Sequence, residues 1–100
     1  MNKQIEFKFN NDAKSLPNIS RGDYTWYEWT IYMDEDDTKL DSVDKVEYHL
    51  HPSFPDPIQV VTNRDTKFAF SARGWGTFRI DIVIYLKDDS EAHAHHNLKF

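Results

Sequence analysis

The sequence contains no cysteine, which excludes a disulfide framework and a cysteine-ligated zinc site. No apolar run approaches the roughly 18 residues of a membrane-spanning helix, so we expect no direct membrane insertion. The 12 basic and 17 acidic residues give a net charge of −5. A chain of that sign repels the phosphate backbone, so nucleic acid is not an expected partner. The N-terminus lacks a basic-then-apolar signal pattern, and we expect a cytoplasmic protein.

Aromatic residues are abundant instead, at 15% of the chain. Apolar residues recur at every second position rather than at intervals of three and four, so the pattern predicts strands and no helix. The length of 100 residues predicts a single domain, with residues 1–24 as an N-terminal strand and loop and residues 25–100 as the core. Seven to eight short strands in one domain indicate an all-β fold, an immunoglobulin-like antiparallel β-sandwich.

The predicted strands are bounded by turn residues. We place them at residues 4–10, 24–33, 43–51 and 58–61, around Phe68 and Phe70, and at residues 77–87 and 91–100. In the first, Ile5, Phe7 and Phe9 form the buried face. A loop without evident chemistry follows over residues 11–23. Rings on both faces of the second strand predict a central position in its sheet. The third delivers His51 to the rim, with Val46, Tyr48 and Leu50 inward.

The segment that ends the third strand, residues 50–57, reads Leu-His-Pro-Ser-Phe-Pro-Asp-Pro. Its three prolines prevent the strand from continuing, because proline lacks an N–H and fixes its own φ. We expect a stiff loop that presents His51, Ser53 and Phe54 at low entropic cost.

A second unusual segment places Trp75 between Gly74 and Gly76. One interpretation is a tight turn whose indole folds onto the end of the sandwich. The other is a loop whose backbone N–H groups and indole line a ligand slot, with the glycines leaving room for the ligand. Spacing alone does not separate these two interpretations.

Taken together, residues 46–57 (Val-Glu-Tyr-His-Leu-His-Pro-Ser-Phe-Pro-Asp-Pro), the later Gly-Trp-Gly-Thr-Phe at 74–78 and an Ile-rich strand form a paired signature. This signature resembles the YEATS domain family, and a strand that begins at Trp29 also fits. The N-terminal strand and the Trp-rich second strand are more similar to the prokaryotic branch (pYEATS) than to histone-reading members. The family implies the same immunoglobulin-like sandwich and a non-catalytic reader of acylated lysine.

The resemblance also implies roles for individual residues. Phe54 and Trp75 would sandwich the flat acyl group, and the Ser53 hydroxyl would bond the acyl amide. The backbone N–H of Trp75 would bond the acyl carbonyl, and His51 would pack against the alkyl stem. The implied ligand-binding residues are His51, Ser53, Phe54, Gly74, Trp75, Gly76 and Phe78. Two rings with one donor and one acceptor suit a planar amide, and the implied partner is an acylated-lysine peptide or protein.

The sequence departs from the histone readers at one place. Those members have a further aromatic wall just before the third strand, and that place falls near Ser42 and Val43 here, so one wall of the slot is expected to be missing. Prokaryotic members commonly occur beside membrane or effector domains in what look like signalling or defence proteins, so the resemblance implies such domains in a parent chain. The alternative is a protein-protein interaction or sensor module of such a protein, without acyl-lysine binding.

Two histidine pairs, His49 with His51 and His93 with His95, stand two residues apart on one strand face, where a metal could bridge them. Solvent-facing polar positions on alternating strands explain these histidines better than metal binding does. Ser53 near His51 evokes a nucleophile and its base, yet no third orienting group is identifiable. We expect no metal, no cofactor and no catalytic residue.

An acidic cluster runs from Asp34 to Asp37, with Asp41 and Asp44 just beyond it. We interpret it as a solvated loop. The alternative is a steering field for a cationic partner such as a lysine-rich peptide.

Overall fold

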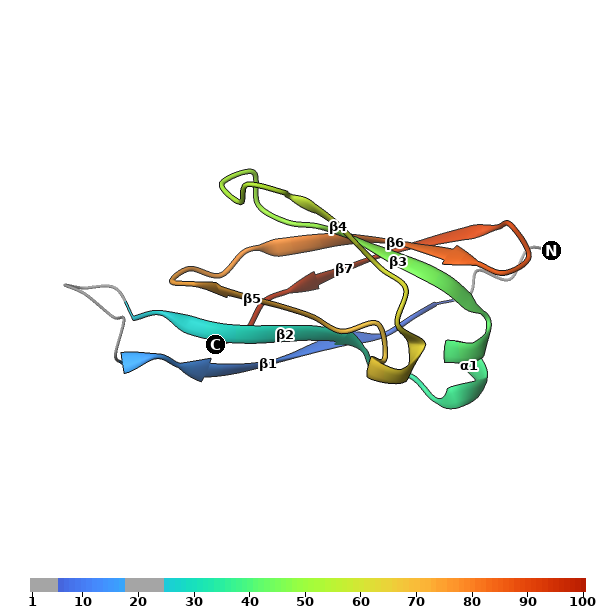
Figure 1. The fold of residues 1–100 in the computed structure, drawn as a ribbon, viewed down its shortest axis with the longest axis horizontal. Helices are drawn as coiled ribbons and strands as arrows, with labels where there is room; N and C mark the ends of the chain where they lie inside the picture. The colour runs from blue at the N-terminus through green and yellow to red at the C-terminus, as the bar shows by residue number, and fades with distance from the viewer. Residues whose placement is uncertain (1–5, 18–24) are drawn as a thin grey trace.

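The computed structural model describes residues 6–17 and 25–100, which form two antiparallel β-sheets stacked as layers (Figure 1). One sheet has the strand order β1-β2-β5 and the other β4-β3-β6-β7. The strands span Phe9–Ser15 (β1), Tyr27–Met33 (β2), Val43–His49 (β3), Ile58–Val61 (β4), Phe70–Gly74 (β5), Arg79–Leu86 (β6) and Glu91–Asn97 (β7). The sequence predicts an antiparallel sandwich of seven to eight strands, and the described residues confirm it with seven.

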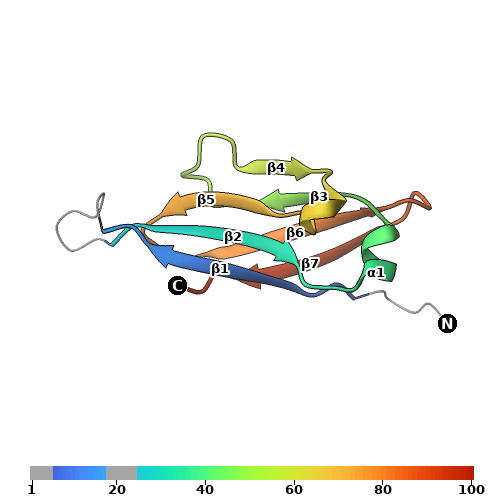
Figure 2. The same ribbon diagram turned by 60° about the horizontal axis from the view of Figure 1, so that its bottom comes forward.

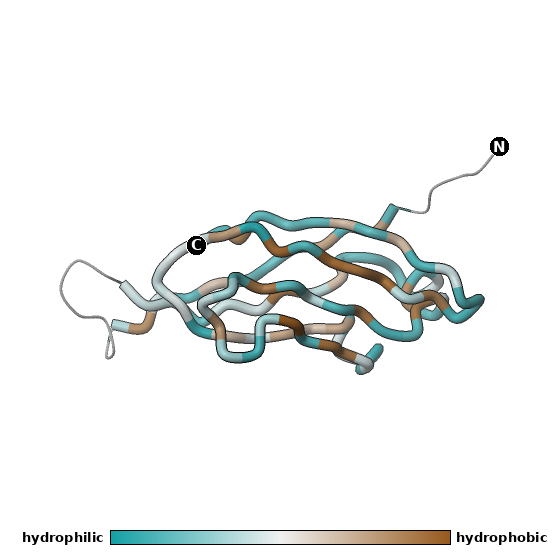
Figure 3. The backbone as a smooth tube through the Cα atoms, turned by 90° about the horizontal axis from the view of Figure 1, so that it is seen from above, coloured by the Kyte–Doolittle hydropathy of each residue, from teal (hydrophilic) through white to brown (hydrophobic). Residues whose placement is uncertain are grey.

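The core lies between the sheets and takes its side chains from alternate positions of the strands, because successive residues of a strand point to opposite faces. Hydrophobic and hydrophilic stretches accordingly alternate along the chain (Figure 3). Val46, Tyr48 and Leu50 face inward as predicted. The largest fully buried side chains are Trp29, Tyr48, Phe68, Ile31, Met33, Leu40, Ile80, Ile82, Ile84 and Val46.

Strand β2 is the central strand of its sheet, as its rings on both faces predict. It pairs with β1 from Phe9↔Met33 to Ser15↔Tyr27. On its other side it pairs with β5, where Tyr27 lies opposite Gly74. This second register decides which residues meet at the end of the sandwich.

The predicted position of the first strand is wrong. Residues 6–8 lie outside any strand, and β1 continues to Ser15 through residues expected to form a loop. The strand forms by pairing with β2 along its whole length. Asn11 also ties it to the opposite sheet, because its side-chain oxygen accepts hydrogen bonds from His96 Nε2 (2.7 Å) and from the Lys99 backbone N–H (3.1 Å). Phe7 is buried as expected, whereas Ile5 lies outside the described residues.

The expectation that the chain has no helix is also wrong, because the acidic cluster starts the short helix α1 (Asp37–Asp41). The Asp36 carboxylate caps it by accepting the Lys39 backbone N–H at 3.0 Å, and Leu40 anchors it in the core. A turn of 3-10 helix, η2 (Arg64–Thr66), faces it, and Arg64 bonds Asp41 Oδ1 at 2.7 Å. No helix in the described part of the chain is long and apolar enough to cross a membrane.

The two ends of the sandwich differ. Helix α1 and η2 lie at one end, and the loop between β5 and β6 lies at the other (Figures 1 and 2). The β3–β4 loop also points away from α1. The two segments that the sequence singles out therefore lie far from the acidic cluster.

Candidate functional site

The loop between β3 and β4 is closed at its base by a hydrogen bond from the Leu50 backbone N–H to the Pro57 carbonyl, at 2.6 Å. Strand β3 ends at His49, two residues before the predicted end. Within the loop, the Phe54 backbone N–H donates to the His51 carbonyl at 3.0 Å. Together with the prolines, which fix φ, these bonds hold His51, Ser53 and Phe54 in one short arc.

His51 and Ser53 form a local hydrogen-bonded pair. The Ser53 backbone N–H lies 3.1 Å from His51 Nδ1, and the Ser53 hydroxyl lies 2.9 Å from the same nitrogen. A backbone N–H can only donate, so Nδ1 is the acceptor and the neutral ring carries its proton on Nε2. The hydroxyl then donates to Nδ1 as well, which leaves the Ser53 oxygen lone pairs available to accept a hydrogen bond from a ligand.

Phe54 is half-buried and packs against one ring from β2 and one from the β5–β6 loop. Its centroid lies 5.7 Å from that of Phe78 and 6.5 Å from that of Trp29, the latter edge-on. The ring centroids of Phe78 and His51 are 6.0 Å apart. The Phe78 carbonyl accepts a hydrogen bond from the Leu98 backbone N–H at 3.1 Å. This wall of the site is therefore fixed by the core.

Trp75 follows β5, and this residue is 55% exposed. Neither neighbouring glycine has a left-handed φ, and a Cβ at Gly76 would meet no atom within 4 Å. A Cβ at Gly74 would lie 3.9 Å from Trp29 Nε1, an ordinary contact. The protein's own backbone therefore does not require glycine at these positions, so the glycines make open space beside Trp75.

The two segments surround one cavity of about 460 Å³, a volume typical of small-molecule sites. Residues that line it come from the position just before β2, the β3–β4 loop, the end of β5 and the β5–β6 loop. They are Trp26, His51, Ser53, Phe54, Pro55, Arg73, Gly74, Trp75, Gly76, Thr77 and Phe78. All seven residues implied by the resemblance are thus brought together around one cavity.

Residues 27–99 match the family model described as the prokaryotic YEATS domain. The chain belongs to this family. This YEATS domain is 34% identical over 71 residues to transcription initiation factor TFIID subunit 14 of Schizosaccharomyces pombe, a match that covers 66% of this chain. It spans only 29% to 41% of the length of that protein and two AF-9 homologs.

Solved structures of YEATS domains have the same fold. The Yaf9 YEATS domain recognizing an H3K122suc peptide superposes with a TM-score of 0.72 at 23% identity, covering 99% of this chain and 80% of that one. The Yaf9 YEATS domain bound to H3K27ac gives 0.71 at 22% identity, with 99% and 79% covered. The immunoglobulin-like β-sandwich expected from the sequence is therefore confirmed.

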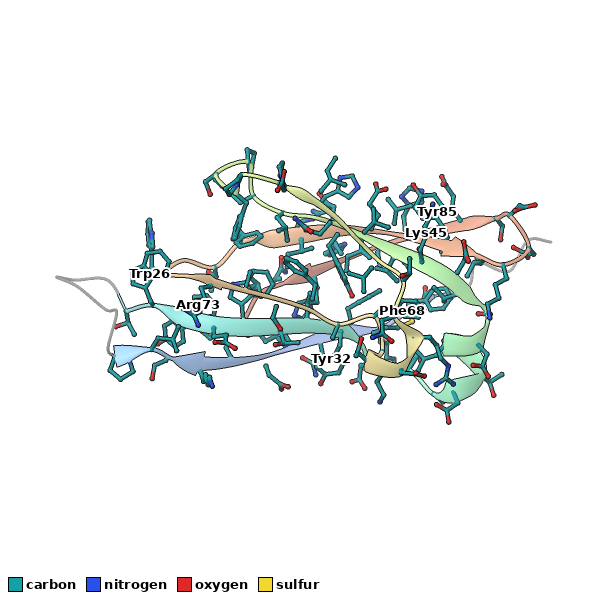
Figure 4. All side chains as sticks on the ribbon, viewed as in Figure 1. Trp26, Tyr32, Lys45, Phe68, Arg73 and Tyr85 are labelled. Carbon is teal, nitrogen blue, oxygen red and sulfur yellow. The ribbon has the colours of Figure 1, made fainter. Side chains whose placement is uncertain are left out.

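Four residues that line the cavity escaped the sequence reasoning, namely Trp26, Pro55, Arg73 and Thr77. Trp26 and Arg73 lie at the same end of the YEATS domain (Figure 4). Tyr27 pairs with Gly74 across β2 and β5, so Trp26 and Arg73 flank this pair. For Trp26 the signal was the pairing of two distant strands, which the sequence pattern did not give, whereas Pro55, Arg73 and Thr77 are chain neighbours of predicted site residues.

The family resemblance places the further aromatic wall of the histone readers near Ser42 and Val43, and this position does not belong to the cavity. Ser42 caps the end of α1, and Val43 is buried in the core. Both lie at the α1 end of the sandwich (Figure 1). An aromatic side chain there could not reach the cavity, whereas Trp26 lines it.

One histidine of each pair singled out as metal-bridging has a carboxylate partner. His49 Nε2 lies 2.6 Å from Glu47 Oε1, and His93 Nε2 lies 3.3 Å from Glu91 Oε1. Among the described residues no three His, Asp or Glu side chains are arranged to hold a metal ion. Nor does any described carboxylate bond to His51.

Proposed function

We propose that this YEATS domain binds an acylated lysine side chain in the cavity formed by the β3–β4 and β5–β6 loops. The observation that carries the proposal is the meeting of Phe54, Ser53 and Trp75 around a single cavity. Yaf9 YEATS domains of the same fold have been solved with acylated histone H3 peptides, which supports a peptide or protein bearing an acylated lysine as the partner. The role is binding rather than catalysis.

The chemistry of the lining matches that ligand. An acylated lysine presents a planar amide on an apolar stem, and aromatic faces bind such a group by area and by stacking. The Ser53 oxygen, whose own proton points to His51, would accept the lysine amide N–H. The backbone N–H of Trp75 would donate to the acyl carbonyl. His51 would pack against the stem, and Gly74, Gly76 and Phe78 would complete the wall.

Unmodified lysine would be rejected. None of the described residues that line the cavity is a carboxylate, and Arg73 is a cation. An ammonium group that entered would lose water without gaining a partner of opposite charge, which is unfavourable.

A second candidate function is a protein-protein interaction or sensor module of a larger protein that does not bind acyl-lysine. The observation that favours it is on β4, an edge strand, where Ile58 and Val60 are both about half-exposed. Edge strands with apolar side chains are common sites of strand addition.

Tryptophan fluorescence during titration with an acetyl-lysine peptide tests the first proposal, because Trp26 and Trp75 line the cavity. We expect saturable binding by the parent and none by Trp75→Ala. Tyr32→Ala is the matched control, since it removes an aromatic side chain from β2 toward the other end of the strand (Figure 4). Equal binding by parent and Trp75→Ala would rule out the proposed site.

A further inference from the structure

The indole nitrogen of Trp29 is the one buried side-chain nitrogen or oxygen without a hydrogen-bond partner in the part of the chain that the structure describes. Trp29 lies in β2 and is only 1% exposed. Its ring packs edge-on against Phe54, Phe70 and Phe78, and none of these side chains has an acceptor atom. Buried donors are nearly always paired, so this N–H calls for an explanation.

This nitrogen lies behind the part of the cavity wall that Gly74 forms. Gly74 pairs with Tyr27, two residues before Trp29 in β2, and alternate residues of β5 face the interior. The side-chain position of Gly74 therefore points inward. A Cβ built there would lie 3.9 Å from Trp29 Nε1, and no other described atom outside the neighbouring residues lies within 4 Å of it. Gly74 also lines the cavity, so it leaves an open space between the cavity and the unpaired N–H.

An acceptor oxygen that entered this space would come within reach of the indole. The usual N–H···O distance is about 2.9 Å, so the oxygen would lie roughly 1 Å deeper than the Cβ position of Gly74. Nε1 is itself covered, so a neighbouring ring has to shift. Phe54 is the ring that can do so, because it belongs to a loop and is only half-buried.

The acyl carbonyl of the ligand fits this donor. It is the only oxygen that an acetyl group brings into the cavity, and a carbonyl oxygen has two lone pairs. The backbone N–H of Trp75 would take one of them. The second lone pair would otherwise lose water without gaining a partner, which is unfavourable in a site lined by aromatic rings.

We propose that the indole N–H of Trp29 donates a second hydrogen bond to the acyl carbonyl of the bound lysine, through the space that Gly74 leaves open. The inference rests on the proposed acyl-lysine binding and adds Trp29 to the residues of that site. It also gives Gly74 a specific role, because a larger side chain there would separate the indole from the ligand.

The experiment removes the indole N–H while keeping the shape of the ring. Trp29→benzothienylalanine puts sulfur in place of the N–H, and calorimetric titration with an acetyl-lysine peptide compares its Kd with that of the parent. We expect Kd to rise roughly two- to tenfold, the range for loss of one hydrogen bond. Urea denaturation should show no loss of stability, because the N–H has no partner within the described protein.

Gly74→Ala tests the same contact from the other side. Its methyl group would fill the open space at an ordinary contact distance from the indole, so the domain should fold and bind the peptide more weakly. In the Gly74→Ala background, the change at Trp29 should cause no further loss of affinity. Ser71→Thr is the matched control and should keep the parental Kd, because it adds one methyl group on the exposed face of the same strand.

A parental Kd in the benzothienylalanine variant would overturn the role of Trp29 and leave acyl-lysine binding standing. An equal loss of affinity in the parent and Gly74→Ala backgrounds would do the same. Failure of the parent to bind the peptide would overturn both proposals.

Discussion

The Ser53 hydroxyl and the Ser53 backbone N–H both point to Nδ1 of His51, at 2.9 and 3.1 Å. This pairing orients the serine oxygen as an acceptor before any ligand arrives. A ligand amide N–H would therefore meet an acceptor whose orientation needs no further ordering.

Replacing the serine should weaken binding. Ser53→Ala removes the acceptor for the lysine amide, and loss of one hydrogen bond corresponds to about 0.5–1.5 kcal/mol, or roughly two- to tenfold in Kd. Ser53 is exposed, so stability should change little. Ser71→Ala is the control, since Ser71 bonds Thr30 at 2.6 Å on an exposed face of β5. If both variants bind acetyl-lysine peptide as the parent does, Ser53 has no role in recognition.

Burial of Tyr48 makes its hydroxyl important for stability. The hydroxyl donates to the Phe68 carbonyl at 2.6 Å, and Phe68 is buried. Lys67 and Phe68 both have a left-handed φ, of 58° and 55°. Tyr48→Phe leaves that carbonyl without its donor and should lower the free energy of unfolding by about 1–3 kcal/mol. Urea denaturation measures it, with Tyr32→Phe as a partly exposed control. A loss no larger than that of the control would contradict this assignment.

The stability of the domain should fall as the pH drops below about 6.5, the ordinary pKa of histidine. Burial lowers the pKa of His96, and nearby Lys99 and His95 lower it further. A depressed pKa in the folded state means that the neutral ring contributes stability above the unfolded pKa, and this contribution is lost as pH falls through the folded pKa. Thermal unfolding at pH 7.5 and 5.0 should show the loss.

A pair of histidine variants separates this effect from general acid destabilisation. His96→Gln should reduce the loss of stability between pH 7.5 and 5.0. His93→Gln, at a side chain that is 67% exposed, should keep it. If the two variants lose the same stability as the parent, His96 is not the responsible group.

The capping role of Asp36 predicts an effect on stability and none on binding. Asp36→Ala removes the acceptor of the Lys39 N–H and should cost about 0.5–2 kcal/mol, measured by urea denaturation against Asp34→Ala. Affinity for an acyl-lysine peptide should be unchanged, because α1 lies at the other end of the sandwich (Figure 2). A marked drop in affinity would revive the idea that the acidic cluster steers a cationic partner.

Strands that bury one face could be predicted from the sequence, because the apolar residues of β3 and β6 alternate with polar ones. Strand β1 could not be placed in this way. Its residues from Asn10 to Ser15 are polar apart from Ala13, and it is fixed by pairing with β2 and by the bonds from Asn11 to Lys99, 88 positions later. The five residues of α1 are too few to produce a helical period.

The candidate site was predictable where its residues are adjacent in the chain. Two short segments contain all seven predicted residues, and each segment is a loop that brings its own side chains together. Trp26 was missed because it reaches the cavity through the pairing of β2 with β5. That pairing depends on contacts between residues nearly fifty positions apart, which no local pattern encodes.

The most direct test of acyl-lysine binding is a titration of the isotope-labelled domain with an acetyl-lysine peptide, followed by the amide signals of each residue. We expect saturable shifts at Ser53, Phe54, Trp75 and Gly76, and no shifts with the unmodified peptide. The absence of shifts at saturating peptide, or shifts confined to Ile58 and Val60 on β4, would contradict it.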